Sequence, residues 1–73
     1  MPNKDLKKID EYHRLEWDKK NYYDLINGSL NKISVAETDE ERYKQVCNVM
    51  DYTLKYANLS IKSHKLIKEL YGE

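Results

Sequence analysis

Asp10 and His13 have the spacing of a helical metal or acid–base site. In an α-helix, residues three positions apart lie on one face, so the carboxylate and the imidazole are neighbours. Di-iron helical bundles use a related Glu-x-x-His pair twice, together with two further glutamates. The pair occurs once in this sequence, and no set of carboxylates on an apolar face accompanies it. We therefore expect a solvated Asp–His pair and no metal ion.

Ser60 and His64 lie one helical turn apart and correspond to two members of a catalytic triad. A working triad also needs an orienting carboxylate and an oxyanion hole, and the sequence has no Gly-x-Ser-x-Gly turn. The single cysteine, Cys47, cannot form a disulfide within the chain, and we expect it to be a buried structural thiol without activation. We predict no catalytic residues, no enzymatic activity and no cofactor.

A basic segment with tyrosines at its start has the composition of a phosphate-binding and base-stacking surface. It contains four lysines without an intervening acid, namely Lys55, Lys62, Lys65 and Lys68. The whole chain, however, balances 13 basic against 13 acidic residues and has no net charge. Nucleic-acid-binding domains usually carry a clear positive excess. We predict a solvated basic face and do not expect nucleic acid as a partner.

The elements that position these residues are predicted to be helices. Gly28 is the only strong interior helix breaker in the 73 residues, and no segment alternates convincingly with period two. Thr38 followed by Asp39, Glu40 and Glu41 is a capping-box start signal with acids in the first turn. The pattern from Thr38 then predicts an uninterrupted helix to about Tyr71, ended by Gly72.

The N-terminal half of the chain predicts a second long helix. It begins near Asn3 or Asp5 and runs at least to Ile26. At Gly28 it either breaks, with a short helix after it, or continues to about Ser34 at a cost of about 1 kcal/mol. We predict a single helical domain, residues 1–73, in which two long antiparallel helices form a hairpin that turns at residues 35–37.

The predicted C-terminal helix carries two apolar stripes with alternating spacings of three and four residues, roughly on opposite sides. The first stripe contains Tyr43, Cys47, Met50, Leu54, Ala57, Ile61, His64 and Tyr71. The second stripe contains Val49, Tyr52, Tyr56, Leu59, Leu66 and Leu70, with Ser63 as an interruption. A helix that is apolar on two sides needs two neighbours.

One stripe is expected to face the other helix of the hairpin, and the remaining one to face another chain. We predict the second stripe as the interface of a homodimer or higher homo-oligomer, most simply a two-fold dimer that forms a four-helix bundle. Its tyrosines are typical of interfaces. A three-helix protomer, which would cover both stripes within one chain, is the alternative.

These features predict a small non-enzymatic helical oligomer that binds another protein and regulates or inhibits it, of the kind carried by phages and other mobile elements. No segment is apolar enough to span a membrane or to act as a signal peptide, so we expect no membrane partner and a cytoplasmic location. The alternative hypothesis is an oligomer that sequesters a nucleotide or another small phosphorylated ligand. In that case Arg14 or Arg42 would pair with a phosphate and Tyr43 would stack on a base.

Overall fold

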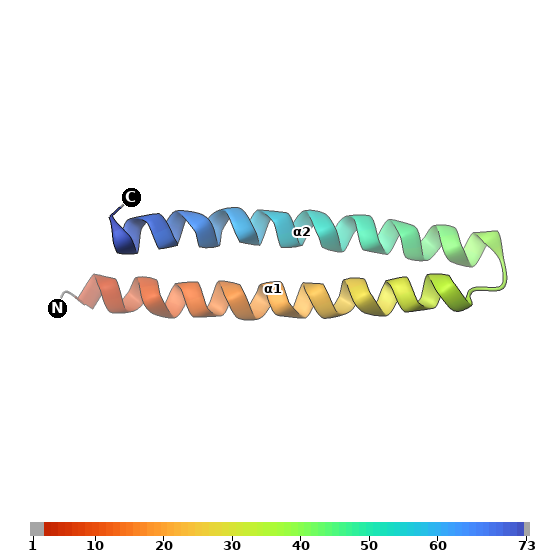
Figure 1. Ribbon diagram of the computed structural model, residues 1–73, viewed down its shortest axis with the longest axis horizontal. Helices are drawn as coiled ribbons and strands as arrows, with labels where there is room; N and C mark the ends of the chain where they lie inside the picture. The colour runs from red at the N-terminus through yellow and green to blue at the C-terminus, as the bar shows by residue number, and fades with distance from the viewer. Residues whose placement is uncertain (1–2, 73) are drawn as a thin grey trace.

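Two long antiparallel helices account for nearly all of the structure (Figure 1). The computed structural model describes residues 3–72, with side chains described from Leu6 onward. Helix α1 spans Asn3–Val35 and helix α2 spans Asp39–Tyr71, each with 33 residues. The hairpin measures 57 × 16 × 12 Å, and both chain ends lie at the same end of the rod. The all-helical hairpin is confirmed, and residues 3–72 hold no third helix, so the three-helix protomer is wrong for this part of the chain.

The predicted ends of α2 are confirmed by their hydrogen bonds. Thr38 has an extended backbone, and its hydroxyl oxygen accepts a hydrogen bond from the amide of Glu41 at 3.1 Å. At the other end Gly72 has a left-handed backbone, with φ 77° and ψ 30°, and its amide donates to the carbonyl of Lys68 at 2.9 Å. Each cap satisfies a backbone group that the helix itself leaves without a partner.

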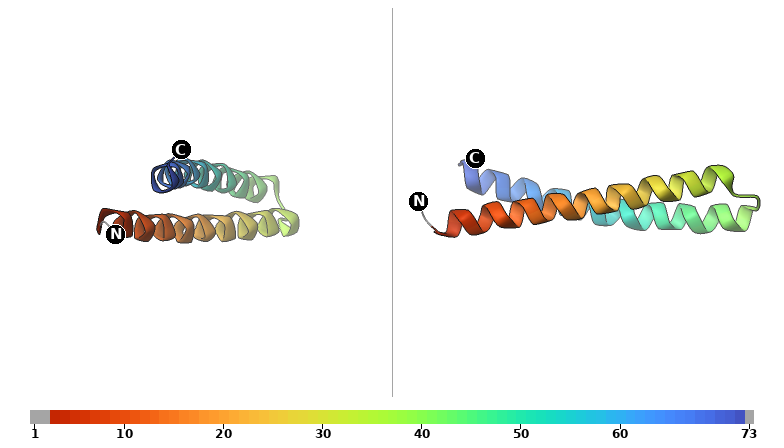
Figure 2. Two further views of the ribbon diagram at one scale, coloured as in Figure 1. Left: turned by 60° about the vertical axis from the view of Figure 1, so that its left-hand side comes forward. Right: turned by 90° about the horizontal axis from the view of Figure 1, so that it is seen from below.

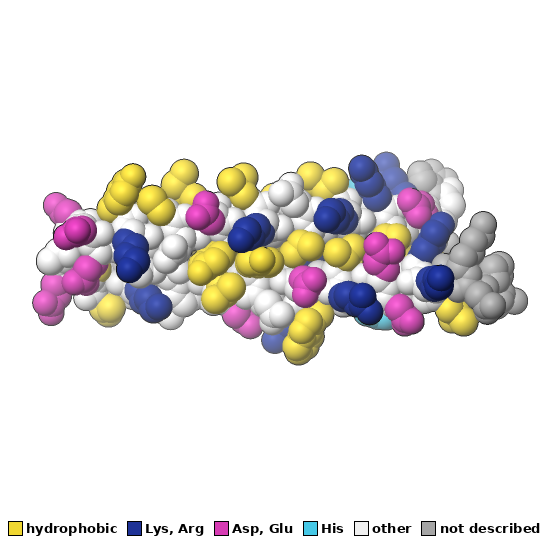
Figure 3. Space-filling model, turned by 180° about the vertical axis from the view of Figure 1, so that it is seen from behind, with side chains coloured by type: hydrophobic (Ala, Val, Ile, Leu, Met, Phe, Trp, Pro, Cys, Tyr) yellow, Lys and Arg dark blue, Asp and Glu magenta, His cyan; other side chains and the backbone are white. Residues whose placement is uncertain are grey.

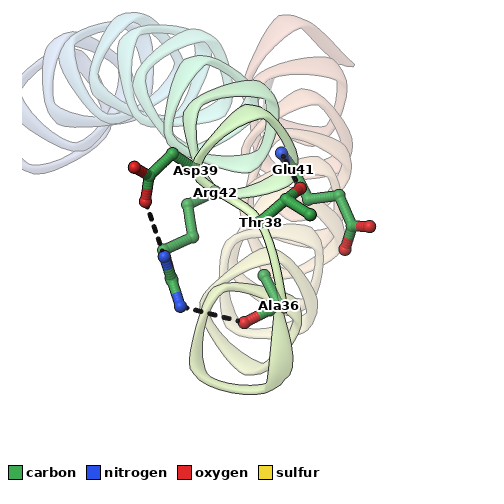
Figure 4. Close-up of polar contacts among 5 residues, drawn as sticks. All are labelled: Ala36, Thr38, Asp39, Glu41 and Arg42. Atoms are coloured by element: carbon green, nitrogen blue, oxygen red, sulfur yellow. Dashed lines mark hydrogen bonds and ion pairs between the residues drawn. The ribbon is translucent and has the colours of Figure 1, made fainter.

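Arg42 ties the turn to the first turn of α2 (Figure 4). Its guanidinium donates to the carboxylate of Asp39 at 2.7 Å and to the backbone carbonyl of Ala36 at 3.1 Å. The carboxylate of Glu41 points away from the cap in the same view, so Glu41 contributes its backbone amide to the capping contact. The predicted turn near residues 35–37 is therefore held by a side chain from the first turn of α2.

Helix α1 passes through Gly28 without a break, so the predicted alternative of a short second helix is wrong. The surroundings explain the continuity. Ser29 is buried against α2, and the half-buried Ile26 and Ile33 hold the helix on both sides of the glycine. Packing of this kind offsets the roughly 1 kcal/mol that an interior glycine costs.

Helix α2 turns its second stripe toward α1. Leu66 is buried, Val49, Tyr52, Tyr56, Leu59 and Leu70 are half-buried, and Ser63 is the most buried residue among them. The assignment of the two stripes is thus the reverse of the prediction, in which the second stripe faced another chain. The helices cross at a shallow angle in Figure 2, as expected when side chains at a spacing of three and four residues pack along a common line.

The seam between the helices buries very little apolar surface. Leu66, at 8% exposure, is the one buried hydrophobic side chain in the described part of the chain, and none there is fully buried. Two helices give each side chain neighbours on one side only, which explains the absence of a closed core in this region. A domain of this size has marginal stability unless a further contact covers its apolar surface.

Replacement of the interior glycine should stabilise the hairpin. A Cβ atom added at Gly28 meets no atom within 4 Å, so Gly28→Ala is expected to raise the free energy of unfolding by about 0.5–1 kcal/mol. Urea denaturation followed by circular dichroism measures this change. Gly72→Ala is the matched control and should destabilise the protein, because the φ of 77° at Gly72 disfavours a side chain. A destabilised Gly28→Ala variant would contradict the continuous α1.

Candidate interaction surface

Glu16 is the polar centre of the seam between the helices. Its carboxylate accepts a hydrogen bond from the hydroxyl of Ser63 at 2.6 Å and one from the ammonium of Lys19 at 3.1 Å. The Ser63 hydrogen bond lowers the pKa of Glu16 below its ordinary value, and Lys19 acts in the same direction, against a smaller opposing effect of burial. Glu16 and Lys19, two half-buried polar residues in the middle of α1, therefore have partners inside the hairpin.

Aromatic side chains also form contacts between α1 and the second stripe. The rings of Tyr22 and Tyr52 lie 6.1 Å apart, and the ammonium of Lys19 lies 5.6 Å from the ring centre of Tyr56. Such contacts contribute on the order of 0.5–1 kcal/mol each beyond the burial of area. Toward the chain ends, Lys8 pairs with Glu69 at 3.1 Å and confirms the same antiparallel register.

The first stripe of α2 faces solvent along its whole length. Its five large apolar side chains keep between 56% and 75% of their surface exposed, and they are Tyr43, Met50, Leu54, Ile61 and Tyr71. Ala57 and His64 are also exposed, while Cys47 is half-buried. Figure 3 shows hydrophobic side chains along the edge of α2 that points away from α1. Exposed apolar edges of this extent are typical of interaction surfaces.

Helix α1 presents a different outer surface. Many of its outward side chains are polar, such as those of Asp10, Asp24 and Asn31. Its exposed large hydrophobic side chains do not follow a single stripe, and they are Leu6, Trp17, Tyr23, Leu25, Leu30 and Val35. The exposed apolar side chains of α2, in contrast, mostly follow the first stripe.

A shallow groove of about 520 Å³ lies between the helices. It is lined by Asp18, Asn21, Tyr22, Leu25, Lys55, Asn58, Leu59 and Lys62. The ammonium of Lys55 lies 5.9 Å from the ring centre of Tyr22 and occupies one side of this ring. The predicted basic segment is thus divided, because Lys55 and Lys62 line the groove while Lys65 and Lys68 are not among its lining residues.

The residues predicted to bind a phosphorylated ligand do not meet within one hairpin. Arg42 lies beside the turn and donates to Asp39 and Ala36, whereas Arg14 lies in the N-terminal half of α1. At 1.5 Å per residue, the two arginines lie roughly 25–30 Å apart along the hairpin. Tyr43 follows Arg42 but belongs to the exposed first stripe. Ligand binding by these residues stays a prediction.

Neither a metal site nor a membrane span is found within the described residues. No three side chains of the His, Cys, Asp and Glu types gather there in a way that would hold a metal ion. Neither α1 nor α2 combines the length and the apolar character needed to cross a bilayer. Comparison of the chain with protein-family models, curated proteins and solved structures finds no match.

The sequence contained one further signal about the two stripes. In an antiparallel hairpin that turns near residue 37, positions whose numbers add up to nearly the same value lie side by side. This rule places Lys19 level with Tyr56, as the structure has it, whereas Ser63 lies about one and a half turns beyond the level of Glu16. The pairing of Lys19 with Tyr56 therefore favours the second stripe as the one that α1 covers.

The Glu16 contact should make the stability of the hairpin depend on pH. A carboxyl whose pKa is lowered by folding stabilises the folded state at pH values above its ordinary pKa of 4.5. This contribution is lost as the pH falls through the lower pKa that the carboxyl has in the folded state. Glu16→Gln should therefore flatten the dependence of the free energy of unfolding on pH below about 4.5. Urea denaturation at a series of pH values between about 3 and 7 measures this dependence. Glu11→Gln, which removes an exposed carboxyl of α1, is the matched control. Equal slopes for the two variants would contradict the assigned role of Glu16.

Proposed function

We propose that this protein is a non-enzymatic helical interaction module that self-associates through the first stripe of α2 and, as a dimer of hairpins, binds and regulates another protein. The exposure of that stripe carries the proposal. Five large apolar side chains lie on one edge of α2, each at least 56% exposed. Water contact with so much apolar surface is unfavourable by about 25 cal/mol for each Å².

The size of the first stripe suits a protein interface. Its exposed apolar side chains offer on the order of 600 Å² per protomer, a large part of the roughly 800 Å² per partner that a standard interface buries. The weak core of the hairpin supports the same conclusion. With Leu66 as the one buried hydrophobic side chain in the described region, a second hairpin on the first stripe would add buried apolar surface that one hairpin lacks.

The binding of a further protein rests on the surfaces that self-association through α2 leaves open. The solvated outer side of α1, with Trp17 exposed on it, and the groove lined by Lys55 and Lys62 are both outside the first stripe. Exposed aromatic and charged side chains of this kind are typical of recognition sites. The identity of the regulated protein and the inhibitory outcome remain part of the proposal.

A charged side chain in the middle of the first stripe should separate the dimer. Leu54→Glu is expected to raise the dimer dissociation constant on the order of 100-fold or more, because each dimer would bury two uncompensated carboxylates. Light scattering and sedimentation at micromolar concentration give the mass. Leu25→Glu is the matched control, since Leu25 is 46% exposed but lines the groove with Lys55 and Lys62. A monomeric wild-type protein at these concentrations would remove the proposal.

A further inference from the structure

The charges on and beside the first stripe change sign along α2. Glu40 and Lys68 lie in line with Leu54, because all three are separated by multiples of seven residues. Asp51 and Lys65 lie in a second line that borders the stripe. All four charged residues are exposed, and within residues 3–72 none of them forms an ion pair. Lys44 also lies in this second line, so the line is not purely acidic in its N-terminal half, but the two charged residues nearest its centre, Asp51 and Lys65, have opposite signs.

This order of charges suits an antiparallel second copy. If two α2 helices pack along their first stripes in opposite directions about an axis near Ala57, Asp51 of one copy lies within about 3 Å, along the helix axis, of Lys65 of the other. In a parallel arrangement each of these two side chains would instead lie beside its own duplicate, and both contacts would be repulsive. The dipoles of antiparallel helices also oppose each other.

The shape of the stripe suits a two-fold axis near its middle. Ala57 lies halfway between Tyr43 and Tyr71, the two ends of the stripe. A residue close to a two-fold axis meets its own duplicate, and a small side chain there allows two helices to approach closely. Leu54 and Ile61 flank Ala57 and would then form the apolar centre of the interface.

We infer that α2 packs antiparallel against α2 of a second copy, along the first stripe and about a two-fold axis close to Ala57. This arrangement rests on the proposed self-association and adds its partner surface and orientation. It leaves both α1 helices on the outside of the dimer.

The single cysteine allows the orientation to be tested by disulfide crosslinking. In the antiparallel dimer the two Cys47 side chains lie about 30 Å apart along the axis, since each is ten residues from the centre. Oxidation with copper–phenanthroline should therefore leave the wild-type protein uncrosslinked. With Cys47→Ser as background, Ala57→Cys should crosslink efficiently, because a disulfide needs Cα atoms within about 7 Å. Leu54→Cys and Ile61→Cys in the same background locate the axis by where crosslinking is greatest.

An exchange of charges tests the same arrangement without cysteines. Asp51→Lys alone and Lys65→Asp alone should each weaken the dimer about threefold to tenfold, because each creates two repulsive contacts. The double variant Asp51→Lys with Lys65→Asp should restore wild-type affinity. Sedimentation at low ionic strength measures all four proteins. A double variant no tighter than the single ones would overturn the antiparallel pairing.

The outcomes separate this inference from the proposed function. Crosslinking at Cys47 in a dimeric protein would show parallel helices and overturn the inference. A dimeric mass with no crosslinking at Cys47, Leu54→Cys, Ala57→Cys or Ile61→Cys would also overturn it, while self-association would stand. A monomeric mass would instead remove the proposed function on which the inference rests.

Discussion

A helix in a two-helix hairpin has one neighbour, and this limit governs the whole structure. Helix α2 carries apolar side chains on two sides, and α1 covers one of them. The hairpin can satisfy one stripe through packing, so the other remains in water whichever way α2 is turned. The thin core and the exposed edge of α2 are two results of the same limit.

Polar side chains decide which stripe is covered. Glu16 and Lys19 occupy the seam of α1, where they would be unfavourable against an apolar surface. The second stripe offers Ser63 to Glu16 and the ring of Tyr56 to Lys19. The first stripe has Ala57 near the level of Lys19, which offers no ring, and its large apolar side chains are left exposed. The hydrogen bond of Glu16 and the contact of Lys19 thus favour the arrangement in which α1 covers the second stripe.

The helix boundaries could be predicted from local chemistry, whereas the orientation of α2 could not be predicted from periodicity. Thr38 and Gly72 are strong cap residues, and both end α2 as expected. The two stripes, in contrast, obey the same spacing, so a pattern within α2 cannot distinguish them. The choice depends on pairs between distant parts of the chain, such as Glu16 and Ser63. Gly28 shows the same limit, because tertiary packing of Ser29 outweighs a local helix-breaking tendency.

The nearly empty interior around Leu66 also has a consequence for the cell. If a second copy supplies much of the folding free energy, mass action links the folded fraction to the amount of protein made. Sparse chains would stay largely unfolded and open to proteases, while abundant chains would protect one another. The level of synthesis would then act as a threshold, below which little functional protein accumulates.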